Sequence, residues 1–307
     1  CDIMIPTQKK RNHKHAYLAV FDNQKWVPIC YGTQKGKVCY FNEIGKDIAY
    51  LPLYYDNQGI HPITDPFILD SRGRIKYLHA DTSKRKKVIL SRKYYLAKHI
   101  FDYAKTLTGG HFEASNNPDF SDPDTIHTIS HWLLSADSFE IKPQKTYRYW
   151  RYVSAKNKGC NLAELAFYSD KEEKELTGTI IGTNASVRYD TMPMDKSKVF
   201  DKDILTYYEA PSTVDYPWVG LDFNKPVSIN KIIYTPRNDD NNIHAGDLYE
   251  LFYWEYNHWM SLGQQRAIES KLTYTNVPDN ALLLLKDLTK GEEERIFTYE
   301  NDKQVWW

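Results

Sequence analysis

The stretch SKVFDKDILTYYEAPSTVDYPWVGLDFNKPVSINKIIYTPRNDDNNIHAGDLYELFYWEYNHW, residues 197–259, decides how we interpret the 307-residue chain. Within it, apolar and aromatic residues alternate with polar ones at 218–223, 229–234 and 248–254, and this alternation is typical of half-buried β-strands. Asn, Lys and Pro form a turn signal between the first two runs, and a loop rich in Asn and Asp precedes the third. The stretch therefore predicts an antiparallel β-meander with polar loops.

Four motifs follow one another here: FDKDILT at 200–206, WVGLDF at 218–223, INKIIYTPR at 229–237 and YELFYW at 249–254. Their order over Leu176–Trp307 resembles the discoidin domain, the coagulation factor 5/8 type C domain, whose relatives include galactose-binding-like carbohydrate-binding modules. The resemblance implies a β-sandwich jelly roll that carries ligand-binding loops at one end. It covers under half of the chain, and a fold alone does not identify a ligand.

Charge and composition limit the classes of partner. Lys and Arg together number 40, as do Asp and Glu, so no net field attracts nucleic acid or an acidic membrane surface. Aromatic residues make up 14%, and flat amphipathic rings suit both strand packing and the apolar faces of sugars. No apolar run reaches the roughly 18 residues that a membrane-spanning helix needs. We therefore expect neither a nucleic-acid partner nor a transmembrane segment.

The cysteines bear on the compartment. The chain begins with Cys1, as a bacterial lipoprotein does once its signal peptide is removed, and a fragment of a longer protein would begin in the same way. We expect an exported protein of the bacterial cell surface or periplasm, with a lipid anchor at Cys1 as one reading. Cys30 and Cys39 flank a turn at Gln34-Lys35, and both a cross-strand disulfide and two buried thiols fit that spacing.

Composition along the chain predicts two domains. Residues 1–15 are polar and basic without periodicity, which indicates a flexible arm. Short apolar runs separated by turns follow and predict an N-terminal β-sandwich over 16–170, in which only 92–107 leaves helix and strand both open. The charged stretch DKEEKE at 170–175 has the composition of a linker. A discoidin-like β-sandwich is expected over 171–307, so the predicted fold is all-β, with two β-sandwich domains and a galactose-binding-like jelly roll as the second.

Two further phrases bear on this division. RYWRYVS and NLAELAFYS, between residues 148 and 169, resemble the closing strands of galactose-binding-like modules. A strand, a Lys-Gly turn and a second strand recur in the same layout from Leu283 onward. The recurrence predicts that both halves of the chain end in the same kind of hairpin.

The acidic loop before the WVGLDF motif is a candidate metal site. In the family that the motifs resemble, a structural calcium commonly binds at the positions of Asp201, Asp203 and Thr206. Carboxylate, hydroxyl and backbone oxygens suit this hard cation, which takes about six to eight ligands. Lys202 stands where the family usually has Gly, and an Asp-rich turn that caps the next strand is the alternative. A carboxylate among residues 292–294 could complete the site.

The polar loop after the INKIIYTPR motif is a candidate sugar site. The resemblance to galactose-type modules implies that an Arg after the Pro, and an Asn five residues later, hydrogen-bond sugar hydroxyls. Arg237 and Asn242 have this spacing, and Asp239 lies between them. Arg offers forked donors, whereas Asn offers a donor and an acceptor together, which suits vicinal hydroxyls. A structural Arg that pairs with an Asp of the same loop is the alternative.

Two aromatic residues flank the preceding loop. Tyr208 and Trp218 bracket residues 209–217, which the resemblance places at the same end of the jelly roll. An exposed ring there would give a sugar a stacking platform, whereas core packing is the alternative for both residues. We include both among the candidate ligand-binding residues.

The motifs give little support to catalysis. The sequence lacks G-x-S-x-G, H-E-x-x-H and P-loop signatures, and no acid/base pair is recognisable. We expect a non-catalytic pair of carbohydrate-binding modules of an exported protein, with a galactose-type or other glycan as partner. The whole chain also resembles the C-terminal region of bacterial surface lipoproteins that carry a transglutaminase-like domain upstream, which leaves a structural or protein-adhesion module as the alternative. An enzyme that uses Cys160 and a His in a cleft is a third possibility.

Overall fold

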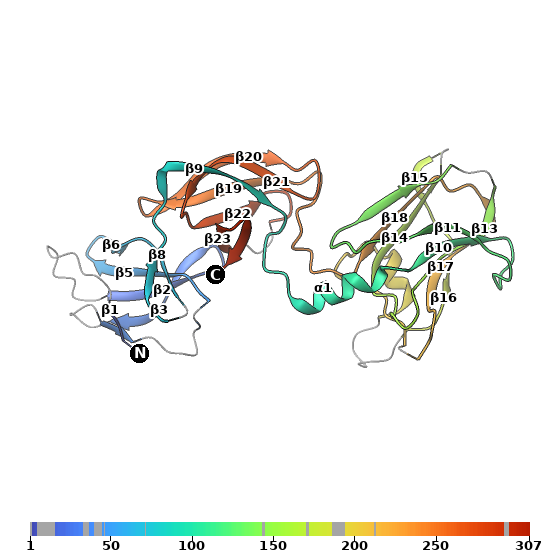
Figure 1. The fold of residues 1–307 in the computed structure, drawn as a ribbon, viewed down its shortest axis with the longest axis horizontal. Coiled ribbons are helices and arrows are strands. Elements are labelled where there is room, and N and C mark those ends of the chain that lie inside the picture. The colour runs from blue at the N-terminus through green and yellow to red at the C-terminus, as the bar shows by residue number, and fades with distance from the viewer. Residues whose placement is uncertain are drawn as a thin grey trace. The chain divides into compact units, whose positions relative to one another are not determined.

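The computed structural model describes residues 2–4, 16–32, 37–39, 45, 47–70, 72–142, 145–169, 172–185, 194–211, 213–291 and 295–307. These residues form antiparallel sheets with very little helix, which confirms the all-β prediction (Figure 1). The chain divides into two compact units: unit 1 comprises Cys1–Tyr95 and Ile243–Trp307, and unit 2 comprises Leu96–Asn242. Unit 2 is therefore an insertion in the sequence of unit 1. None of the helices in the described ranges has the length and apolar composition that a membrane crossing requires.

Unit 2 is a sandwich of two antiparallel sheets. A five-stranded sheet has the order β11-β10-β13-β17-β16, and a four-stranded sheet has the order β12-β18-β14-β15. The bounds are β10 (His111–Ser115), β11 (Asp124–Thr128), β12 (Asp137–Glu140), β13 (Tyr147–Val153), β14 (Leu162–Ser169), β15 (Glu172–Leu176), β16 (Thr179–Gly182), β17 (Trp218–Val227) and β18 (Lys231–Pro236). Three short helical segments accompany them: α1 (Lys98–Ala104), η2 (Lys105–Leu107) and η3 (Lys196–Phe200). The open segment 92–107 thus contains a helix.

Apolar side chains from both sheets form one core in unit 2. Phe112 and Trp150 come from the five-stranded sheet, whereas Phe167 and Tyr234 come from the four-stranded sheet, and all four are buried. The rings of Phe112 and Tyr234 lie 5.3 Å apart, and those of Trp150 and Phe167 lie 6.3 Å apart. The alternation of apolar residues in each strand places apolar side chains on the inner face of each sheet, where they make these cross-sheet contacts.

The stretch 197–259 forms strands where the sequence predicts them, but it does not form a meander. Strand β17 runs on through the turn signal and pairs with β13 and β16, whereas β18 lies in the opposite sheet between β12 and β14. The third run is β19 (Leu248–Glu255), which belongs to unit 1. Alternation predicts a strand locally, whereas its partners depend on the whole core, and sandwich chains commonly cross between sheets.

The predicted domain boundary at residues 170 and 171 needs correction. Strands β14 and β15 on either side of it pair antiparallel inside unit 2, with Phe167 opposite Leu176. The stretch DKEEKE is charged because β15 is an edge strand, and edge strands commonly carry charges. Domains over 16–170 and 171–307 are thus replaced by an inserted and a discontinuous unit. Of the expected arm at 1–15, Asp2–Met4 form strand β1 paired with β4, and 5–15 lie outside the described residues.

Unit 1 combines strands from both ends of the chain. One sheet has the order β1-β4-β3-β2-β5-β7-β8, with β6 beside β5, and a second has the order β20-β19-β22-β23-β24. Strand β9 from before the insertion pairs with β21 from after it. The remaining bounds are β1 (Asp2–Met4), β2 (Ala16–Asp22), β3 (Lys25–Gly32), β4 (Lys37–Cys39), β5 (Tyr50–Asp56), β6 (Gly59–Pro62), β7 (Phe67–Leu69), β8 (Ile75–Tyr77), β9 (Asp81–Leu90), β20 (His258–Arg266), β21 (Leu272–Asp279), β22 (Leu283–Asp287), β23 (Ile296–Glu300) and β24 (Lys303–Trp306).

The core of unit 1 joins its two larger sheets. Leu51 and Ile68 from the first sheet pack in one buried cluster with Trp254 and Leu284 from the second. Ile296 belongs to the same cluster and Trp307 packs against it, so the C-terminal segment is part of this core. Near the other end, Gly32 lies opposite Val38. This is one residue out of the register that would bring Cys30 and Cys39 face to face, and Cys30 is a free thiol. The side chain of Cys39 lies outside the described residues.

Candidate functional site

Arg237, the first candidate sugar ligand, is held inside a cluster of unit 2. Its guanidinium carbon lies 3.7 Å from the ring centre of Tyr103 on α1 and 3.6 Å from that of Tyr207. Nη1 donates to Asn161 Oδ1 and to Glu209 Oε2, each at 3.3 Å. Both faces of the planar cation are therefore covered by rings, an arrangement that stabilises the fold electrostatically.

The burial of this cluster limits what Arg237 can offer to a ligand. Only 16% of its side chain and 12% of the Glu209 side chain are exposed. The backbone N–H of Arg237 also donates to the carbonyl of Asn161, at 2.9 Å. These contacts match the alternative of an arginine that braces its loops, with Glu209 as one ion-pair partner.

The other two residues of this loop also make contacts within unit 2. Asn242 is 4% exposed, and its Nδ2 donates to the carbonyl of Leu134 at 2.6 Å. Asp239 Oδ1 accepts from the backbone N–H of Asn241 at 3.2 Å, as in an Asx-turn. These hydrogen bonds hold the loop in place. The role of its residues in sugar binding stays a prediction.

The two candidate aromatic residues pack in different places. Tyr208 is fully buried, and its hydroxyl donates to the carbonyl of Thr183 at 2.7 Å. The ring of Trp218 lies 5.6 Å from that of Phe120 and 5.0 Å from the guanidinium carbon of Arg151. Neither contact opens a stacking platform beside the polar loop, so the structure shows packing for both residues.

The predicted metal loop is closed by its own hydrogen bonds. The hydroxyl of Thr206 donates to the carboxylate of Asp201 at 3.0 Å, and the backbone N–H of Asp203 donates to the same carboxylate at 3.0 Å. Lys198 Nζ pairs with Asp201 Oδ2 at 3.0 Å. Lys202 has a φ of +68°, the left-handed conformation for which Gly is usual.

Glu164 joins this loop, which the sequence did not predict. Burial and, to a lesser extent, the nearby Asp201 carboxylate together raise the pKa of the Glu164 carboxyl to about 7. Among the described residues, Glu164 Oε1 is buried without a hydrogen-bond partner. A carboxylate in the apolar strand LAELAF is the signal in the sequence that could have identified Glu164. Residues 292–294, the carboxylates expected to complete the metal site, lie outside the described residues.

These donors fit a hard cation. Carboxylates from Glu164 and Asp201, the Thr206 hydroxyl, and the carbonyls of Lys198 and Asp203 that this hydroxyl contacts are all oxygen ligands. Among the described residues, no three or more Asp, Glu, His or Cys side chains are grouped so that they could hold a metal ion. A cation here would therefore take carbonyl and water oxygens for much of its coordination.

A hollow of about 660 Å³ lies in unit 1, where the sequence predicted no site. Strand β5 supplies Tyr54, β6 supplies His61, and the turn after β19 supplies Tyr256. The whole lining consists of Tyr54, Ile60, His61, Pro62, Ile63, Thr64, Asp65, His79, Ala80, Trp254, Glu255, Tyr256 and Asn257. The hollow therefore combines three aromatic side chains with imidazoles and carboxylates.

Contacts with neighbouring side chains hold the polar groups of this hollow in position. His79 Nδ1 lies 2.8 Å from Asp65 Oδ2, and the imidazole of His61 packs on the ring of Tyr54, with centres 5.2 Å apart. Glu255 Oε2 accepts from the hydroxyl of a neighbouring Tyr at 3.0 Å. Side chains fixed in this way lose little further entropy when a ligand binds.

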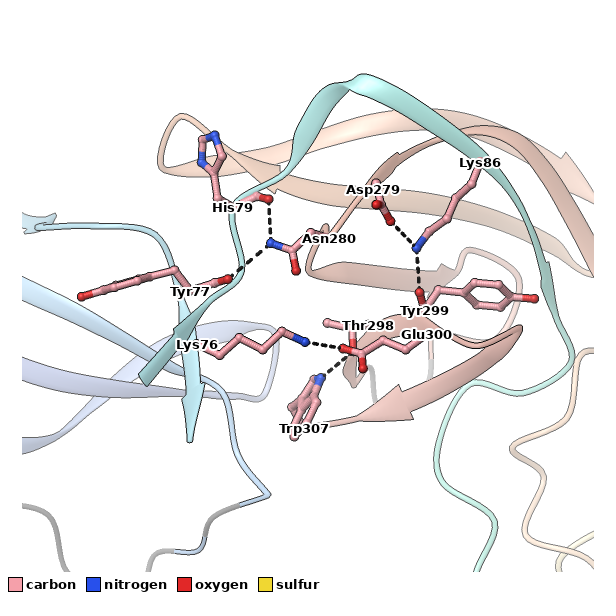
Figure 2. Close-up of polar contacts among 10 residues, drawn as sticks. All are labelled: Lys76, Tyr77, His79, Lys86, Asp279, Asn280, Thr298, Tyr299, Glu300 and Trp307. Carbon is pink, nitrogen blue, oxygen red and sulfur yellow. Dashed lines mark hydrogen bonds and ion pairs between the residues drawn. The ribbon is translucent and has the colours of Figure 1, made fainter. Parts of the chain in front are cut away.

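A polar cluster beside the hollow fixes one edge of it (Figure 2). Asn280 Nδ2 donates to the carbonyl of His79 at 3.0 Å, which holds the backbone that carries this imidazole. Lys76 Nζ pairs with Glu300 Oε1 at 3.1 Å, and Lys86 Nζ donates to Asp279 Oδ1 at 2.7 Å. These charged side chains also line a second, smaller hollow of about 280 Å³.

Cys160 does not have the environment of a nucleophile. It is fully buried, and its thiol donates to the carbonyl of Pro217 at 3.4 Å. Burial raises the pKa of the Cys160 thiol far above its ordinary value, which keeps it protonated. This residue therefore belongs to the core of unit 2.

Comparison of the chain with known protein families, with curated proteins and with solved structures finds no match.

Proposed function

We propose that the protein is a non-catalytic carbohydrate-binding protein and that its glycan lies in the hollow of unit 1. The observation that carries this proposal is one concavity in which the exposed ring of Tyr256 lies among hydrogen-bonding side chains, with the buried rings of Tyr54 and Trp254 in its lining. Aromatic rings pack on the apolar faces of sugars, and carboxylates and imidazoles accept or donate to their hydroxyls. A volume of about 660 Å³ is within the range of small-molecule sites and suits one or two sugar rings.

The proposal keeps the expected class of ligand but moves its site. The polar loop of unit 2 presents a guanidinium that is covered on both faces, whereas the hollow of unit 1 offers open, pre-arranged polar groups. Export to the bacterial surface or periplasm belongs to the same proposal, because free glycans and glycan polymers are abundant there. A surface protein as partner is the alternative, and it would leave the hollow without a sugar.

We also propose that unit 2 is the discoidin-like part of the chain. WVGLDF and INKIIYTPR, together with RYWRYVS and NLAELAFYS, all fall in strands or strand ends of this one unit. Calcium at the loop of Asp201 and Thr206 would then be a structural ion, held also by Glu164. The unpartnered carboxylate oxygen of Glu164 supports this, because a cation would neutralise it.

The binding proposal is tested by a glycan array followed by titration of the best ligand with the full chain. Asp65→Asn removes a carboxylate from the hollow, and since a hydrogen bond to a charged group contributes about 1.5–3 kcal/mol, we expect affinity to fall at least roughly tenfold. Asp22→Asn, an exposed carboxylate outside the lining, serves as the matched control and should leave affinity unchanged.

Arg237→Ala distinguishes the two possible sites. If the glycan lies in unit 1, this variant binds as the parent does, although unit 2 loses stability because the buried Glu209 carboxylate loses its ion pair with Arg237. A loss of affinity for Arg237→Ala with unchanged binding by Asp65→Asn would return the site to unit 2. Binding to no glycan on the array would contradict the proposed function as a whole.

A further inference from the structure

The turn between β19 and β20 contains a residue in an unfavourable conformation. Tyr256 and Asn257 form its two central positions, with φ angles of +49° and +65°, between the paired residues Glu255 and His258. Both angles are left-handed, as a tight two-residue hairpin turn requires. Asn tolerates this conformation through local hydrogen bonds, whereas a bulky aromatic residue is seldom found there.

The same chain provides two comparisons. The hairpin between β2 and β3 begins its turn with Asn23, at a φ of +45°, and the hairpin between β23 and β24 begins its turn with Asn301, at a φ of +50°. Only the β19–β20 turn, among these three, places Tyr at the first central position. The local sequence therefore departs from the solution that the chain uses elsewhere.

The fold does not account for this departure. Tyr256 is 75% exposed, so burial of its ring contributes little to the stability of unit 1. The side chain does, however, line the hollow, at the tip of a hairpin whose strand β19 also supplies Trp254. Residues kept in an unfavourable backbone conformation cluster at ligand sites, where the position of a side chain matters more than its local cost.

We infer that Tyr256 is the stacking platform of the hollow and that the ligand is a neutral glycan. This inference rests on the proposed function and specifies it. Asp65 and Glu255 contribute carboxylates to the lining, His61 and His79 contribute imidazoles, and none of the described lining residues is a Lys or an Arg. Carboxylates accept from sugar hydroxyls, but they repel the anionic groups of uronate, sialate or sulfated glycans.

Three variants of the full chain test the inference. Tyr256→Asn copies the other two turns, so we expect the thermal midpoint of unfolding to rise by a few degrees while affinity for the neutral glycan falls at least roughly tenfold. Tyr256→Phe keeps the ring and should bind within a few-fold of the parent. Tyr55→Ala removes a Tyr that is 54% exposed and does not line the hollow, and it should leave affinity unchanged.

The outcomes separate this inference from the proposed function. A higher midpoint with unchanged affinity for Tyr256→Asn would contradict the platform, while loss of binding in Asp65→Asn would still support the site. A lower midpoint for Tyr256→Asn would show that the ring serves the fold and would overturn the inference. Equal binding of a neutral glycan and its sulfated counterpart would contradict the ligand class. Absence of binding to either glycan by the parent protein would instead contradict the proposed function.

Discussion

Glu164 is the residue whose charge depends most on its surroundings in the proposed cation loop. Its pKa is raised from 4.5 to about 7 by burial and by the Asp201 carboxylate. Between pH 4.5 and about 7, the Glu164 carboxyl keeps its proton in the folded protein but has lost it in the unfolded chain. The resulting stability is present below pH 4.5 and is lost as the pH rises through about 7.

This pKa shift predicts the pH dependence of unit 2. In a chelator, the stability of the parent relative to Glu164→Gln should fall between pH 5 and pH 8, by about 1 kcal/mol after allowance for solvent screening. Calcium should remove this fall in the parent and should not stabilise Glu164→Gln. Urea unfolding at several pH values measures both effects. A parent curve that calcium leaves unchanged would argue against the ion.

The sequence identified residues of the right chemistry more readily than their surroundings. Arg237 has the donors that a sugar site needs, and it was found by its spacing from Asn242. The rings that cover it come from Tyr103 and Tyr207, and Tyr103 lies more than a hundred positions earlier in the chain. Exposure is a property of such long-range contacts, so the spacing of two residues cannot report it.

At the scale of elements, alternation predicted strands well and their neighbours poorly. The runs at 218–223 and 248–254 lie within β17 and β19, as expected. The pairing of β17 with β13 depends on a close approach of backbones at Gly220, which sits opposite Arg151. A Cβ at this position would lie 2.0 Å from the carbonyl oxygen of Trp150, so only Gly fits.

Gly220 therefore gives a prediction about this pair of strands. Gly220→Ala should destabilise unit 2 by roughly 3 kcal/mol or more, because the backbone atoms it meets belong to a central strand and cannot move aside. Thr179→Ala, at an exposed position of the neighbouring strand β16, is the control and should change stability by less than about 0.5 kcal/mol. Thermal and urea unfolding measure the difference, and equal stability of the two variants would refute the close approach.

At the scale of the whole molecule, the sequence predicted two β-rich domains but not their order along the chain. Two sandwiches side by side and one unit inserted in another have the same composition. The insertion follows from the pairing of β9 with β21, in which Leu90 lies opposite Leu272. Local sequence patterns do not identify a strand partner so far away in the chain. The charged residues of the edge strand β15 resembled a linker, so the domain boundary was predicted there, inside unit 2.

The insertion predicts which fragments fold. Residues 96–242 contain the complete core cluster of unit 2, so this fragment should unfold cooperatively and give a dispersed amide spectrum. Residues 171–307 lack β10, β13 and β14, along with β9, and should remain unfolded. Circular dichroism melting and NMR of the two fragments measure this. A folded 171–307 fragment would contradict the division of the chain.

The insertion also has a mechanical meaning. The chain leaves unit 1 after Tyr95 and returns to it at Ile243. Force that passes through the intact unit 1 therefore does not act on unit 2. Tension applied at residues 16 and 307 stretches only unit 1 while that unit stays intact. Under pulling, unit 2 would keep its shape until unit 1 ruptures, and its extension would appear as the second event.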